Sequence, residues 1–200
     1  MISYPQLRHL LPTALAILFI ALALHPALTP LLRWQRDALA HGEWYRLLSA
    51  HFVHANLRHA AANALALLTI WVLFESAVTL WVWVLSILLC ALAISALLFA
   101  TDVAWYVGFS GVLHGMLVLA LCRDRRLQIA LRAVLLGAVA AKIGAERLLG
   151  TDSGHWFHIV VISQAHLFGA LTGAAIAAVL TMIDRLTAAR SAIDQNTQHT

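Results

Sequence analysis

The residue best placed to act as a nucleophile is Ser110, in the segment Gly108-Phe109-Ser110-Gly111. A serine flanked by glycines at the start of a helix has an exposed hydroxyl and nearby backbone N–H groups without a helical partner. Such N–H groups stabilise the negative charge that develops on a carbonyl oxygen during acyl transfer. The GxSG pattern often occurs by chance, so it indicates a nucleophile only together with a base.

Two histidines are candidates for the general base. His114 lies four residues after Ser110, so a helix would aim its imidazole back at the serine's turn. His166 lies near the start of a later apolar run and precedes the pattern Gly169-Ala-Leu-Thr-Gly173, while Ser110 precedes Gly111-Val-Leu-His-Gly115. Glycines four residues apart let two helix backbones approach closely. We therefore favour His166 as the base and expect His114 to pack on it and shape the pocket.

His59 and Asn63 are candidates for oxyanion donors. They are four residues apart and so share one helix face, and the residues around them are mostly alanines. A His and an Asn side chain aimed at one point could stabilise an oxyanion. The alternative is a polar clamp between two membrane helices.

The composition of the chain indicates a membrane protein. Of its 200 residues, 62% are hydrophobic and 11% are charged, whereas soluble domains carry about 25% charged residues. We predict an all-α fold, a polytopic bundle of six transmembrane helices over residues 1–183, followed by a polar cytoplasmic tail over residues 184–200. The first apolar run, which begins at Leu10, also resembles a signal peptide, but it continues to Leu32 and we favour a retained helix. The six expected spans are Leu10–Leu32, Leu57–Phe74, Ala77–Ala100, Val107–Cys122, Leu127–Leu149 and Ile159–Ile183.

The arginines in short loops predict the orientation. Arg123, Arg125 and Arg126 mark a cytoplasmic loop, which places both termini in the cytoplasm. The arginines of the first loop oppose this, but that loop is rich in aromatic residues and suits the membrane interface. His59, Ser110 and His166 then all lie in the outer half of the membrane, because each is near the start of a span that runs inward.

The acidic residues do not suggest a partner for His166. Asp102 lies in a loop, and Glu75 closes the second span on the other side. We therefore predict a Ser–His dyad instead of a triad.

Taken together, these residues resemble the rhomboid intramembrane proteases. The resemblance implies a serine protease with Ser110 and His166 as catalytic residues, His59 and Asn63 as oxyanion donors, and no cofactor. It also implies that Gly108, Gly111, His114 and His54 shape the site. The matching segments are His54, His59 and Asn63 within HFVHANLRHAAAN, Trp44-Tyr45-Arg46, GFSG at Gly108–Gly111, and Ala165-His166 through Gly173.

One departure narrows the resemblance. Rhomboids usually have a tyrosine four residues after the serine, and this chain has His114, within GFSGVLHG. That variant is similar to the rhombosortases. It implies a bacterial inner-membrane protease, with its active site toward the periplasm, whose substrates are exported proteins with a C-terminal Gly-Gly-containing segment and transmembrane span. The expected partners are therefore such proteins and membrane lipid.

Other classes of function fit the sequence less well. An intramembrane metal-binding protein or transporter would use the clustered histidines, which are His51, His54 and His59, and His155 and His158, but HExxH and cysteine-rich ligand patterns are absent. A catalytically inactive rhomboid-like protein is disfavoured because both Ser110 and His166 are present. The net charge of +4 does not indicate nucleic-acid binding, since the basic residues form no stripe with interleaved aromatics.

Overall fold

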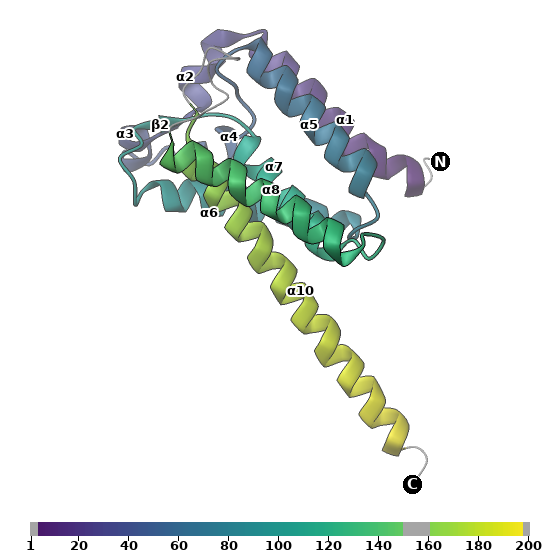
Figure 1. Cartoon of the computed structure of the whole chain (residues 1–200). Helices are drawn as coiled ribbons and strands as arrows, with labels where there is room; N and C mark the ends of the chain where they lie inside the picture. The colour runs from purple at the N-terminus through teal and green to yellow at the C-terminus, as the bar shows by residue number, and fades with distance from the viewer. Residues whose placement is uncertain (1–3, 150–160, 198–200) are drawn as a thin grey trace.

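The computed structural model describes residues 4–149 and 161–197, and most of them are helical (Figure 1). α7 packs mainly against α10 and also contacts α5, α6 and α8, while α1 lies along α5. The elements in chain order are α1 Tyr4–Ala23, the 3-10 helix Pro26–Leu28, α2 Thr29–Leu32, β1 Trp34–Gln35, α3 Arg36–Ala40, α4 Arg46–Ser49, α5 Leu57–Phe74, α6 Leu80–Leu98, β2 Trp105–Tyr106, α7 Ser110–Arg123, α8 Ile129–Leu148 and α10 Ser163–Thr197.

The count of six membrane spans is not confirmed. Within the described residues, α5, α6 and α10 are long and apolar enough to cross a membrane, and a bent pair would make a fourth span. That pair is residues 8–23 and 26–32, which meet at 92°. Pro26 has no backbone N–H to continue the first helix, so the predicted span over Leu10–Leu32 is broken there. α7 has 14 residues, and α8 carries several charges inside its apolar run.

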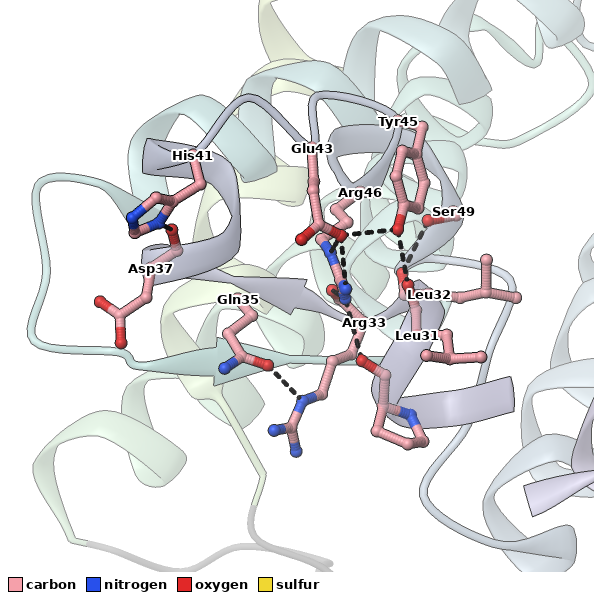
Figure 2. Close-up of polar contacts among 11 residues, drawn as sticks. Leu31, Leu32, Arg33, Gln35, Asp37, His41, Glu43, Tyr45, Arg46 and Ser49 are labelled. Carbon is pink, nitrogen blue, oxygen red and sulfur yellow. Dashed lines mark hydrogen bonds and ion pairs between the residues drawn. The ribbon is translucent and has the colours of Figure 1, made fainter. Parts of the chain in front are cut away.

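The first loop is folded, not extended, and one of its segments pairs with the segment before α7 to form the only strands among the described residues. β1 and β2 form a two-residue antiparallel pair in which Trp34 lies opposite Tyr106. Arg46 is buried and donates to the carbonyl oxygens of Pro30 and Arg33, at 3.0 and 2.9 Å (Figure 2). These bonds tie α4 to the chain that precedes β1 and so hold the loop against the helices.

The last helix runs past the predicted end of the membrane domain. α10 continues without a break from Ser163 to Thr197, and its final part extends beyond the other helices (Figure 1). The residues from Asp184 to Ser191 are exposed. The proposed division at 183/184 therefore falls inside a helix, and the tail's cytoplasmic location stays a prediction.

Candidate active site

Ser110 is the first residue of α7, and the turn before it is fixed from several sides. The Gly108 N–H donates to the Ala50 carbonyl at 3.0 Å, and the Tyr106 hydroxyl donates to the Gly108 carbonyl at 2.6 Å. Gly108 has a φ of 111°, a conformation that residues with a Cβ rarely adopt. Phe109 is fully buried and anchors the turn in the core. The Ser110 hydroxyl is therefore presented at a helix N-terminus by a well-held turn.

α10 approaches α7 closely because both helices carry glycines where they touch. A Cβ added to Gly111 would lie 2.7 Å from the Ala165 carbonyl oxygen. Cβ atoms at Gly169 and Gly173 would overlap the carbonyl oxygens of Gly111 and Gly115. The two helices could not keep this spacing with any side chain at these positions.

This approach brings His166 to Ser110. Oγ of Ser110 lies 2.9 Å from Nε2 of His166, within the range for a nucleophile and its base. On the other side of the ring, Nδ1 of His166 lies 2.7 Å from Oε2 of Glu146. The prediction that no acidic residue orients His166 is therefore wrong, because Glu146 of α8 occupies that position.

A signal for Glu146 was present in the sequence. Glu146 and Lys142 are charged residues four apart inside an apolar run, and Lys142 Nζ lies 2.6 Å from Glu146 Oε1. Charged residues in membrane helices usually face the protein interior, and Glu146 is 8% exposed. Which neighbouring helix it meets depends on the rotation of α8, which the local sequence does not specify.

The His114 imidazole stacks on that of His166, with ring centroids 4.2 Å apart and planes at 19°. Nδ1 of His114 lies 2.7 Å from the Ser110 backbone carbonyl oxygen. Because that oxygen can only accept, Nδ1 carries the hydrogen and is engaged with the backbone. This stacking is the packing that the sequence predicts, and the effect of His114 on the pocket stays a prediction.

His59 is held beside the turn that carries the serine. Its backbone N–H donates to the Asn56 side chain at 2.9 Å, at the start of α5. A Cβ at Gly108 would lie 2.7 Å from Cε1 of His59, so the imidazole rests directly on that glycine. The ring of His54, which is 1% exposed, packs edge-on against His59 with centroids 4.9 Å apart. His54 thus supports His59 from the buried side.

Ser110 and His59 both line two cavities. One has a volume of about 310 Å³ and is also lined by Asn63, His114 and His166. The other has a volume of about 390 Å³ and is lined by residues of segments 103–107 and 161–162. The side chains of His59 and Asn63 therefore reach the same space as the serine hydroxyl, and their role as oxyanion donors stays a prediction.

The clustered histidines do not form a metal site in the part of the chain that the structure describes. His51 is fully buried, and its Nε2 lies 3.0 Å from Oγ of Ser95. His155 and His158 lie outside the described residues. Within residues 4–149 and 161–197, no three His, Cys, Asp or Glu side chains are grouped so that they could hold a metal ion.

Comparison with known proteins agrees with this arrangement. A family model of the rhomboid domain matches residues 41–183, a segment that includes Ser110, Glu146 and His166. A search of curated proteins finds no match. The matched segment is most of the chain, and its apolar helices indicate a membrane protein. We conclude that the chain belongs to the rhomboid family, whose members are generally intramembrane serine proteases that act on membrane-protein substrates.

Proposed function

We propose that the chain is an intramembrane serine endopeptidase in which Ser110 is the nucleophile and His166 the general base. The observation that carries this proposal is the 2.9 Å distance from Ser110 Oγ to His166 Nε2, at the wall of two cavities. Ser110 Oγ attacks the scissile carbonyl carbon while its proton passes to Nε2 of His166. The imidazolium then gives that proton to the leaving amine, and a second nucleophile releases the acyl group.

The developing oxyanion is stabilised by donors on two helices. The first N–H groups of α7 have no acceptor within the helix. Asn63 uses one amide hydrogen to donate to the His59 carbonyl at 2.9 Å, and the amide has a second hydrogen for an oxyanion. His59 and Asn63 are therefore proposed as donors that face the negative charge from the side of α5.

The proposed orientation puts both termini in the cytoplasm of a bacterium and the active site toward the periplasmic side of the inner membrane. Ser110 begins α7, and the basic loop follows the other end of that helix. At that end Arg123 pairs with Asp184 of α10 at 2.7 Å. Because short Arg-rich loops stay in the cytoplasm, the ends of α7 and α10 that carry Ser110 and His166 face the opposite side.

The proposed substrates are exported proteins with a C-terminal Gly-Gly-containing segment followed by a transmembrane span. The resemblance of GFSGVLHG to the rhombosortases supports this choice. Two model substrates that differ only in this motif, Gly-Gly against Leu-Leu, test it. Purified protein should cleave the first and leave the second intact. Equal cleavage of both substrates would contradict the proposed Gly-Gly preference but would still support the assignment as a protease.

A fluorophosphonate probe tests the class of enzyme. It should label the purified protein covalently, mass spectrometry should locate the label on Ser110, and EDTA should not change the labelling rate. A protein that takes no label, or that loses activity with EDTA and regains it with a metal, would instead support the second function class, an intramembrane metal-binding protein or transporter.

Two substitutions test which histidine is the base. Nδ1 of His114 is engaged with the Ser110 carbonyl, while Nε2 of His166 faces the hydroxyl. His114→Tyr keeps an aromatic ring on His166, so we expect it to retain substantial labelling, whereas His166→Ala should lose nearly all of it. The opposite pattern would assign the base to His114.

A further inference from the structure

The carboxylate of Glu146 reaches the proposed base from a third helix. Glu146 lies in α8, 20 residues before His166 and well away in sequence from Ser110. The contact between Oε2 and Nδ1 of His166 is 2.7 Å, and the two side chains are 4% and 6% exposed. α8 therefore contributes a buried polar group behind the Ser110–His166 pair, whose two members come from α7 and α10.

The direction of the hydrogen bonds follows from what each group can donate. A carboxylate only accepts, so Nδ1 of His166 must carry the hydrogen that bonds to Glu146. The neutral imidazole then has its lone pair on Nε2, which faces the Ser110 hydroxyl at 2.9 Å. That tautomer is the one in which His166 can accept the serine proton.

Lys142 keeps the carboxylate charged and in place. Its Nζ lies 2.6 Å from Oε1 of Glu146, one turn back on the same helix, so each carboxylate oxygen has its own partner. Burying a carboxylate without a partner would cost free energy. Here the contacts with Lys142 and His166 together offset that cost. The Lys142 side chain is 47% exposed, so it is much less buried than the carboxylate with which it pairs.

We propose that Glu146 is a positioning residue of the reaction, fixing the tautomer and ring orientation of His166, with Lys142 holding Glu146 ionised. This inference rests on the proposed function of Ser110 and His166. When the Ser110 proton moves to Nε2, the Nδ1 hydrogen stays on its nitrogen, and the imidazolium charge is balanced by the Glu146 carboxylate. Nε2 later passes its proton to the leaving amine, so Glu146 gains no proton in the cycle.

A second buried carboxylate provides a matched control. Asp124, at the far end of α7, is 3% exposed and pairs with Arg126 at 2.6 Å. It caps the Arg126 N–H at 2.9 Å and contacts neither Ser110 nor His166 in the described structure. Asp124→Asn removes a buried charge as Glu146→Gln does, so the two variants separate loss of a structural ion pair from loss of base positioning.

The first experiment measures the rate of fluorophosphonate labelling at Ser110 in the full-length protein. Loss of the carboxylate behind a serine protease histidine costs about 10⁴-fold in turnover, so we expect Glu146→Gln to lower the labelling rate by about 10²–10⁴-fold. Glu146→Asp should recover part of that loss, and Lys142→Gln should show a smaller loss than Glu146→Gln. Asp124→Asn should melt at a lower temperature yet label at nearly the wild-type rate.

A second measurement keeps the inference testable if Glu146→Gln does not fold. In ¹⁵N-histidine NMR, the signal that disappears in His166→Ala should have the shift of an Nδ1–H tautomer in the wild type. An Nε2–H tautomer there would overturn the inference, as would a Glu146→Gln protein that labels at the wild-type rate. Wild-type protein that takes no label at Ser110 would instead overturn the proposed function, so the two failures are distinct.

Discussion

Among the described residues, two Ser–His side-chain pairs have nearly the same spacing and different surroundings. Oγ of Ser110 lies 2.9 Å from Nε2 of His166, and Oγ of Ser95 lies 3.0 Å from Nε2 of His51. Ser95 donates its hydroxyl hydrogen to the Leu47 carbonyl at 2.6 Å. Nε2 of His51 must therefore be the donor in its pair, so His51 cannot remove a proton from Ser95.

The surroundings of the two pairs also differ. Ser95 and His51 are both fully buried, and they fasten α6 to the first loop. Ser110 lines two cavities, and His166 is turned by Glu146 so that its free lone pair meets the hydroxyl. A short Ser–His distance therefore does not by itself identify a nucleophile. The acceptor that each hydroxyl faces, and access for a substrate, decide which pair can do chemistry.

The largest expected effect comes from removing each serine in turn. Loss of the nucleophile costs about 10⁶-fold in serine proteases, so Ser110→Ala should abolish cleavage of a model substrate and leave the melting temperature close to that of the wild type. Ser95→Ala removes the hydrogen bonds from Ser95 to the partly buried Leu47 carbonyl and to Nε2 of His51, at a cost of about 1–3 kcal/mol, and should keep its turnover once folded. Cleavage by Ser110→Ala, or a dead but folded Ser95→Ala, would reverse the comparison.

The next effect concerns the contact between α7 and α10, which brings the reactive pair together. Gly169→Val would push α10 off α7, because even a Cβ there overlaps the Gly111 carbonyl. We expect a loss of stability of about 1–3 kcal/mol or more and a loss of labelling, since His166 moves away from Ser110. Gly137→Val in α8 is the control, because a Cβ at Gly137 meets nothing within 4 Å. Equal melting temperatures and labelling rates in the two variants would show that α10 does not pack there.

A smaller effect is expected from the proposed oxyanion donors, His59 and Asn63. The buried Ser95–His51 pair has no such donors because no reaction is proposed there. His59→Ala and Asn63→Ala should each lower turnover by about 10²–10³-fold, the usual cost of one such donor. Fluorophosphonate labelling should fall only in part, because Ser110 and its base remain in place. Normal turnover in both variants would show that His59 and Asn63 have at most a structural role.

The smallest effect concerns Glu43, which helps to hold α4 beside the buried Ser95–His51 pair. The Tyr45 hydroxyl and the Arg46 guanidinium bond to the Glu43 carboxylate and lower its pKa (Figure 2), and α4 carries Leu47. A lowered pKa means that the stabilisation is full above the ordinary glutamate value of about 4.3 and is lost as pH falls through the folded value. Glu43→Gln should therefore melt slightly lower than wild type at pH 7, with the gap closing toward pH 3. A gap that does not change with pH would contradict this.

The sequence predicted those parts of the site that depend on local pattern. The second span coincides with α5, Leu57–Phe74, and the glycine spacings in two runs anticipated the contact that brings His166 to Ser110. Glu146 was missed because its contact with His166 depends on which neighbouring helix the Lys142–Glu146 face of α8 meets, and the local sequence does not specify that rotation. The predicted count of six spans is not confirmed, because the first run bends by 92° after Ala23 and α7 has only 14 residues.

That α10 carries His166 has a consequence for how the protein is made. A ribosome adds about 5–20 residues per second, and 56 residues separate Ser110 from His166, so the serine is synthesised seconds before its partner. If His166 is the base, as proposed, the growing chain holds an inert serine until the last helix inserts and docks on the glycines of α7, and neighbouring membrane proteins are not exposed to an unfinished protease. Pulse-labelled nascent chains that end before His166 should accordingly take no fluorophosphonate, whereas completed chains should.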